Sequence, residues 1–163
     1  MIEIESPTAC CPGLARLEPS DVDAVSRLFD RLSPASVYRR FFSPIARADH
    51  FTSLLLRVDG HDREAVAAVD GGDVVGVAQY SRRPGSPSAD LAIVVADAWQ
   101  RQGLGTRMIA ALADRARQAG VEEFSVDVQG DNQGALRLLR RVAPELRLRF
   151  SGGVGEGAFP VER

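Results

Sequence analysis

Two glycines stand where an amphipathic helix begins, in the stretch WQRQGLGTRMIAAL at residues 99–112. Glycine at such a position weakens a helix by up to about 1 kcal/mol relative to alanine, which indicates that bare backbone is needed there. The first-turn N–H groups of a helix lack partners and lie at the positive end of the helix dipole, where they bind anions. We therefore expect residues 100–105 to form a strand-to-helix turn that holds a diphosphate.

Two familiar nucleotide-binding motifs do not match this turn. A P-loop requires Gly-Lys-Ser/Thr after four intervening residues, whereas the chain contains no lysine and all 20 of its basic residues are arginine. A dinucleotide-binding fold requires three spaced glycines, an early first strand and a later acidic residue, and residues 99–112 do not match this pattern. The turn at residues 100–105 therefore belongs to a different class of phosphate site.

The length of 163 residues and the hydrophobic content of 45% fit one domain with a single core. We expect this domain over residues 13–163, after a flexible N-terminal segment at residues 1–12. Apolar periodicity and turn residues predict the secondary structure. The expected helices are residues 21–32, 33–42, 48–57, 106–118 and 132–142. The expected strands are a short one from Gly13 and residues 64–70, 73–82, 89–96, 123–128 and 146–150.

Local signals support several of these bounds. Ser20 or Asp21 is the expected N-cap of the first helix. Ser33 is the expected cap of the second helix, with Pro34 in its first turn. The two glycines at residues 71–72 separate two β-rich runs and predict a hairpin.

The order of elements is a strand, helices, three strands, and then helices alternating with strands. This order predicts an α/β fold with a mixed sheet that is antiparallel in its N-terminal part, partly parallel in its C-terminal part and flanked by helices. The glycine-rich tail at residues 151–163 favours a last weak hairpin.

Charge and composition exclude several classes of partner. The net charge of −2 provides no basic field for nucleic acid. No apolar run has membrane length and no N-terminal signal is present, so we expect a soluble cytoplasmic protein without a membrane partner. Cys10 and Cys11 are adjacent and lack the companions of a zinc site, which predicts neither a disulfide framework nor a bound metal.

Pairs of adjacent arginines are candidates for contact with a phosphate or an acidic surface, although a solvated face is the commoner role of such pairs. These pairs are Arg39-Arg40, Arg82-Arg83 and Arg140-Arg141.

The glycine turn fits the pattern Gln/Arg-X-X-Gly-X-Gly/Ala, and here the chain resembles the GNAT superfamily of acyl-CoA-dependent N-acyltransferases. A second motif, DNQGALRLLRR at residues 131–141, resembles the Asn-X-X-Ala-X-X-Leu helix of that superfamily. The two motifs occur in order with a strand between them, and the resemblance covers roughly residues 14–150. It implies a GNAT-like sheet and acetyl-CoA as cosubstrate, with no metal.

The resemblance also implies which residues bind the cofactor. The backbone of Ile93, Val94 and Val95 would bind the pantetheine arm, and Asn132 would bond the pantetheine or the region near the thiol. The turn and first helical residues would hold the pyrophosphate. These residues are Gln100, Arg101, Gln102, Gly103, Leu104, Gly105 and Thr106.

Transfer to an amine requires a base, because an amine with a pKa of about 10.4 is mostly protonated near neutral pH. Asp90 matches a glutamate position of protein-lysine acetyltransferases, and Asp127 matches one used by some ribosomal-protein N-acetyltransferases. Both side chains are one methylene shorter than glutamate, which favours proton transfer through a bridging water. His61 and Glu64 form a third candidate group. A solvated strand-end carboxylate is the structural alternative for either aspartate.

The leaving thiolate requires a proton donor. Many members of the superfamily place a tyrosine seven residues after the Asn of the last motif, but this chain has Leu139 there. Tyr80, on a strand expected beside the cleft, is the preferred donor. Tyr38 and water are the alternatives, and a core position is the structural alternative for Tyr80.

The acceptor is open at this stage. LSPASVYRRFF, HDREAV and ADLAIVVADAWQRQGLG together resemble the catalytic domain of bacterial Pat-type protein-lysine acetyltransferases, which implies a protein lysine. A small amine, such as a polyamine, an amino acid or an antibiotic, is the alternative acceptor, and a non-catalytic acyl-CoA-binding sensor is the alternative function. Tyr38, Phe41 and Phe42 would line the acceptor side, unless they serve only to pack a helix. By family analogy, a homodimer is a further assembly to test.

Overall fold

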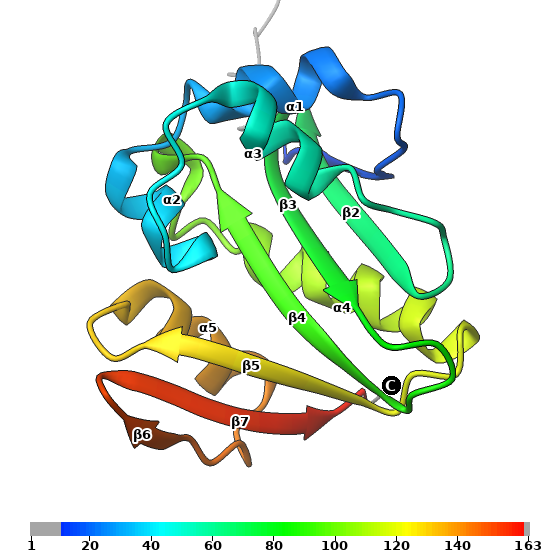
Figure 1. Ribbon diagram of the computed structural model, residues 1–163, viewed down its shortest axis with the longest axis vertical. Coiled ribbons are helices and arrows are strands. Elements are labelled where there is room, and N and C mark those ends of the chain that lie inside the picture. Colours follow the sequence, from blue (N-terminus) through cyan, green and yellow to red (C-terminus); the bar gives the residue numbers. More distant parts are fainter. Residues whose placement is uncertain (1–10, 162–163) are drawn as a thin grey trace, which may run out of the picture.

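The computed structural model describes residues 11–161, so residues 1–10 of the expected N-terminal segment at 1–12 lie outside the description. The chain forms a seven-stranded sheet in the order β1-β2-β3-β4-β5-β7-β6. Figure 1 shows α1, α2 and α3 on one face of this sheet and α4 on the other. The strands are β1 (Gly13–Arg16), β2 (Arg63–Asp70), β3 (Asp73–Ser81), β4 (Ser88–Val95), β5 (Glu123–Gln129), β6 (Arg149–Ser151) and β7 (Val154–Pro160). The helices are α1 (Val22–Phe29), α2 (Pro34–Phe41), α3 (Ala48–Leu55), the short 3-10 helix η1 (Asp97–Trp99), α4 (Leu104–Gln118) and α5 (Gln133–Val142).

The first four strands pair antiparallel in sequence order, which confirms the expected N-terminal part of the sheet. Gly71 and Gly72 both have positive φ angles, of 56° and 87°, and they close the hairpin between β2 and β3. Glycine adopts these angles without a steric penalty, which explains the sequence at this turn. The helix α4 packs across one face of β2 and β3, and α1 packs against β3 on the other face (Figure 1).

The strands β4 and β5 form the parallel part of the sheet, and they pair only briefly. Ser88 lies opposite Glu123, Ala89 opposite Phe124, and Asp90 opposite Ser125. Beyond these pairs β4 continues to Val95 and β5 to Gln129, but the two strands no longer pair with each other. The two strands visibly diverge in Figure 1. The sheet therefore opens into a wedge in its middle.

The C-terminal hairpin differs from the expected strand at residues 146–150. The strand β6 begins only at Arg149, and residues 152–153, both glycines with positive φ, turn the chain into β7. The segment before β6 crosses over Gly157, where a Cβ atom would lie 2.9 Å from the carbonyl oxygen of Arg147. Residues 146–148 therefore pass over β7 and do not pair beside it. The expected hairpin in the tail is confirmed, since β7 pairs with both β6 and β5.

Helix termini follow the sequence signals closely in one case and less closely in others. The Ser33 hydroxyl accepts a hydrogen bond from the Ser36 N–H at 3.1 Å and caps α2, as predicted. The helix α1 ends at Phe29, earlier than expected, and Asp21 accepts from the Glu18 N–H in place of capping the helix with its side chain. The helix α4 begins at Leu104, two residues before the expected Thr106.

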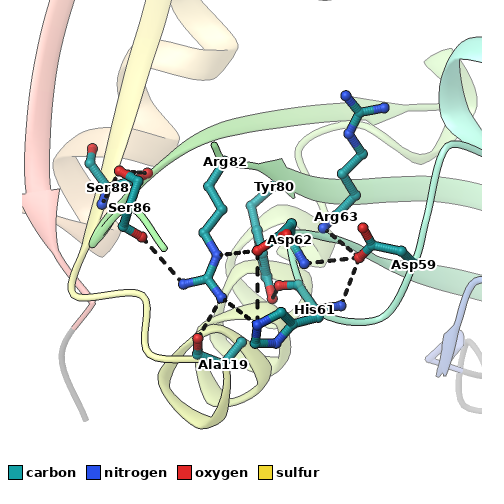
Figure 2. Close-up of polar contacts among 9 residues, drawn as sticks. All are labelled: Asp59, His61, Asp62, Arg63, Tyr80, Arg82, Ser86, Ser88 and Ala119. Atoms are coloured by element: carbon teal, nitrogen blue, oxygen red, sulfur yellow. Dashed lines mark hydrogen bonds and ion pairs between the residues drawn. The ribbon is translucent and has the colours of Figure 1, made fainter. Parts of the chain in front are cut away.

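Arg82 joins three segments that are distant in the sequence, as Figure 2 shows. Its side chain is only 3% exposed and donates to the Asp62 carboxylate at 2.9 Å. It also donates to the Ala119 carbonyl at the end of α4 at 2.6 Å, and to the Ser86 carbonyl before β4 at 3.3 Å. These contacts hold the loop before β2, the end of α4 and the start of β4 together. Ser86 precedes β4 and Ala119 precedes β5, so these contacts tie together the segments that lead into the two strands.

Within residues 11–161, no helix has both the length and the apolar character that crossing a membrane requires.

We predict that Arg82→Met destabilises the fold, because it leaves the part-buried Asp62 and the Ala119 carbonyl without their partner. The expected loss in free energy of unfolding is about 3 kcal/mol. Denaturant unfolding measures it, with the exposed neighbour Arg83→Met as a control that changes stability by less than about 0.5 kcal/mol. Equal stability of the two variants would contradict the role assigned to Arg82.

Candidate active site

A cleft occupies the wedge between β4 and β5 and reaches from α2 on one face of the sheet to α4 and α5 on the other. Its walls are apolar around α4 and α5 and polar toward α2 and the end of β5. The lining residues are Arg39, Arg40, Leu91, Ala92, Ile93, Ile109, Val126, Asp127, Val128, Asn132, Ala135, Leu138 and Leu139.

The edge of β4 presents main-chain groups to this cleft. The Ala96 N–H donates to the Val75 carbonyl of β3 at 2.8 Å, so the main-chain groups of Ala96 point toward β3. The main-chain groups of successive residues in a strand point alternately to its two sides. Val94 therefore directs its N–H and C=O toward β3, whereas Ile93 and Val95 direct theirs toward the cleft. The Val95 carbonyl accepts from the Gln100 side chain at 3.0 Å. Among the expected pantetheine-binding residues, Ile93 and Val95 thus carry the open edge.

The turn after β4 has the shape of an anion site. Arg101 and Gly103 have left-handed φ angles of 63° and 82°, and Gly103 is the N-cap of α4 with no side chain bonded at this cap. The first-turn N–H groups of Leu104, Gly105 and Thr106 therefore lie at an uncapped helix N-terminus. A Cβ atom on Gly103 would meet no other atom within 4 Å, so the space in front of the turn is open.

Two glutamines brace this turn. The Gln100 amide donates to the Ser36 hydroxyl at 3.2 Å as well as to Val95, which ties the turn to α2. The Gln102 amide donates to the Ala98 carbonyl at 3.1 Å. Both residues are predicted to bind the cofactor, and in the structure their side chains hold the backbone of the turn in place.

Gly105 shapes the cleft wall. A Cβ atom there would lie 2.8 Å from a methyl carbon of Leu138 and 3.3 Å from one of Ile93. A real Cβ does not approach another side chain this closely without displacing it. The missing side chain therefore lets α4, α5 and β4 meet at the cleft, in addition to providing a bare N–H group.

The second motif forms one side of the cleft. The Asn132 side chain accepts from the Ala135 N–H at 3.2 Å and caps α5, while the residue itself lines the cleft. Leu139 is 7% exposed and packs in the hydrophobic core. The position that carries a tyrosine in many relatives is thus part of an apolar wall.

The two candidate carboxylates lie on the same face of the sheet. The Ser125 hydroxyl donates to Asp90, at the last pair that β4 and β5 share. Asp127 is two residues further along β5, so its side chain is on the same face as that of Ser125, and it lines the cleft. Both aspartates are exposed. In the described part of the chain, no group of three or more His, Cys, Asp or Glu residues is arranged to hold a metal ion.

The other candidate groups lie away from the cleft. Tyr80 is 1% exposed, packs against Phe124 and donates its hydroxyl hydrogen to the His61 carbonyl at 3.0 Å (Figure 2); burial raises its pKa. Glu64 is 3% exposed and pairs with Arg16 at 3.1 Å. His61 lies at the surface beside Arg82. None of these side chains lines the cleft, whereas Asp127 does.

The aromatic residues of α2 divide between the core and the surface. The Phe41 ring packs edge-on against Phe51 at 5.8 Å between centroids, which is a core contact. Tyr38 and Phe42 are 46% and 37% exposed. Tyr38 lies on α2, which supplies Arg39 and Arg40 to the cleft, and Phe42 is the C-cap of that helix.

Arg40 is a cleft residue that the sequence does not single out from its other arginine pairs. It is half-buried, donates to the Gln79 side-chain oxygen at 2.9 Å, and its guanidinium carbon lies 4.4 Å from the centre of the Phe41 ring. Burial lowers the pKa of its guanidinium to about 10, so the group stays protonated at neutral pH. Only the meeting of α2 with the sheet reveals that this arginine differs from the solvated ones.

The amino-acid sequence matches that of a known family. Residues 26–143 match the acetyltransferase (GNAT) family, and the chain belongs to that family.

Individual relatives agree with this assignment. The acetyltransferase Pat of Mycolicibacterium smegmatis is 28% identical over 127 residues, which are 76% of this chain. The chain spans only 38% of the length of that relative. The GNAT domain of S. lividans PAT superimposes with a TM-score of 0.82 at 22% identity, over 90% of this chain and 89% of that one. The Salmonella typhimurium protein yncA, solved with its cofactor acetyl-CoA, superimposes with a TM-score of 0.72 at 14% identity, over 93% of this chain and 95% of that one.

A charge placed at the N-cap of α4 tests whether the turn holds a diphosphate. We predict that Gly103→Asp weakens acetyl-CoA binding about tenfold or more, because the carboxylate repels the phosphates across a few ångströms. Gly103→Asn is the matched control, since it has the same size and the same tolerance of positive φ without the charge. Calorimetric titration measures both affinities. Equal affinities of the two variants would place the diphosphate elsewhere.

Proposed function

We propose that the chain transfers an acetyl group from acetyl-CoA to a primary amine by direct attack in a ternary complex. The observation that carries this proposal is the wedge between β4 and β5. It has an open strand edge and an uncapped helix N-terminus on one side, and two carboxylates on the other. A thioester held on the first side and an amine arriving from the second would meet where the strands part.

The cofactor would bind along main-chain groups. The pantetheine amides would hydrogen-bond to the main chain of Ile93 and Val95. The pyrophosphate would accept hydrogen bonds from the N–H groups of residues 103–106, and Asn132 would lie near the thiol end. The neighbour yncA, which was solved with its cofactor acetyl-CoA, supports this arrangement through its fold. Bound in this way, the thioester carbonyl would lie between the apolar wall at Leu139 and the carboxylates.

In the chemical step, one carboxylate would take the proton that the amine loses, and water would supply the proton that the leaving thiolate gains. The amine nitrogen forms a bond to the thioester carbonyl carbon, the carbon–sulfur bond breaks, and the amine proton passes to Asp90 or Asp127, directly or through a water. The thiolate then takes a proton from water, because Leu139 has none to give. Tyr80 is not part of this proposal, since its hydroxyl bonds to His61 outside the cleft. Tyr38 is exposed on α2 and is the alternative donor.

A protein lysine is the acceptor that the likeness to Pat favours, although the chain matches only part of that relative. The cleft itself argues against acceptors with several positive charges. Arg39 and Arg40 both line it, so polyamines and polycationic antibiotics would meet like charges there. An amino acid is the small-molecule acceptor that this cleft admits most readily.

We expect replacement of the true base to lower kcat for the best acceptor by about 10²- to 10⁴-fold. The test compares Asp90→Asn with Asp127→Asn, which keep size and leave each strand intact. Asp49→Asn, at an exposed position outside the cleft, is the control. The rate of CoA release measures the effect. Unchanged kcat in both variants would remove both carboxylates from the mechanism.

The acceptor class is tested by transfer of labelled acetyl from acetyl-CoA into a lysate of the source organism. The lysate is separated into protein and small-molecule fractions, and Gly103→Asp, assayed at an acetyl-CoA concentration well below its weakened affinity, serves as the control. Label in protein would support a lysine acceptor, and label in the small fraction would support a metabolite. No transfer above the control, despite acetyl-CoA binding, would favour a non-catalytic sensor.

A further inference from the structure

The cleft holds a positive charge without a counter-ion. Within residues 11–161, no carboxylate oxygen lies within 4 Å of the Arg40 guanidinium, and its one hydrogen bond goes to the neutral Gln79 amide at 2.9 Å. Its Nε atom is shielded from solvent and has no partner. Burying a charged group in this way costs several kcal/mol unless another charge compensates it.

The same chain compensates its other buried charges. Arg82 is 3% exposed and is paired with Asp62 at 2.9 Å. Glu64, equally buried, is paired with Arg16 at 3.1 Å. Among the described residues, Arg40 therefore departs from the rule that the rest of the fold follows. An anion that arrives with a substrate would provide the missing partner.

The position of Arg40 indicates which part of a substrate this anion belongs to. Gln79, its partner, lies opposite Ala92 in the β3–β4 ladder, next to Leu91 and Ile93, β4 residues that line the cleft. This end of the cleft is on the α2 side of the sheet, where Asp127 also lines the cleft. The phosphates of a cofactor would lie at the start of α4. Arg40 would consequently face the reacting ends of the two substrates.

We propose that Arg40 binds a carboxylate carried by one of the two substrates of the proposed acyl transfer. The inference rests on the acyl transfer of that proposed function, and it replaces either the acetyl group or the protein lysine with a substrate that carries a carboxylate. A planar carboxylate matches the fork of N–H donors on a guanidinium, which an ammonium group cannot reproduce. The carboxylate comes either from a dicarboxylic acyl group on CoA or from an amino acid acceptor. In the second case, the amine would face Asp127 while the carboxylate faces Arg40.

Matched pairs of ligands that differ only in the carboxylate test this inference. The acyl pair is succinyl-CoA and butyryl-CoA, titrated by calorimetry. The acceptor pairs are alanine, leucine and lysine with their carboxamides, titrated by NMR in the presence of CoA. We expect the carboxylate member of at least one kind of pair to bind about tenfold to a hundredfold more tightly. A preference in the acyl pair shows that the carboxylate belongs to the acyl group of the donor. A preference in the acceptor pairs shows that it belongs to the amine substrate.

Variants at Arg40 show whether this side chain causes the preference. In Arg40→Met the preference falls to within about twofold, and in Arg40→Lys, which keeps the charge and loses the fork, it is intermediate. Arg47→Met, at an exposed arginine outside the cleft, keeps the full preference. A preference that survives in Arg40→Met, or equal binding in every pair of the wild-type protein, overturns the inference.

Two further readouts keep this test separate from folding and from the proposed function. The unfolding midpoint of ligand-free Arg40→Met should equal or exceed that of the wild type, because removing a buried charge without a counter-ion offsets the lost Gln79 hydrogen bond and Phe41 ring contact. A large loss of stability would instead show that Arg40 is structural and would overturn the inference. CoA release from acetyl-CoA is followed on the same samples. Its absence with all acceptors contradicts the proposed transfer, while the binding preferences still decide the role of Arg40.

Discussion

The pairing of β4 with β5 stops after Asp90 and Ser125, and the rest of the site depends on that stop. Both strands continue, so their facing edges carry main-chain groups that a regular ladder would have used. Gln100 takes one of them, the Val95 carbonyl. The others are available to an extended ligand with amide groups, which can bind as a strand does. The wedge is thus both a gap in the sheet and a template for its occupant.

The two ends of the wedge have opposite electrostatic character for a physical reason. At the α4 end, the left-handed Gly103 leaves the first helical N–H groups uncapped, and Gly105 brings α5 close through contact with Leu138. At the α2 end, Asp127 and Arg40 carry charges of opposite sign and line the same cleft without forming an ion pair. The fold therefore separates a backbone site suited to phosphate from a side-chain site suited to an amine and a carboxylate.

Local chemistry made much of this fold predictable. Ser33 caps α2 and the two glycines at residues 71–72 turn the β2–β3 hairpin, because such residues act through their nearest neighbours. The predicted start of the strand at residue 146 was wrong, because β6 begins where it does through the crossing of residues 146–148 over Gly157, a contact between different segments. The glycine turn was placed correctly from its motif. The core position of Tyr80 was foreseen only as the alternative to a proton-donor role, and the missing counter-ion of Arg40 was not predicted, because each depends on which side chains the tertiary fold brings near.

The measurement that tests the account most directly is an NMR titration of the protein with acetyl-CoA, followed through its backbone amides. The account predicts that saturable shifts concentrate at Ile93, Val95 and residues 103–106, with further shifts around Asn132. The N–H of Val94, which pairs with β3, should move much less than those of its two neighbours. Saturable binding that leaves these amides unchanged, or no binding at millimolar acetyl-CoA, would contradict the claim that the β4–β5 wedge is an acyl-CoA site.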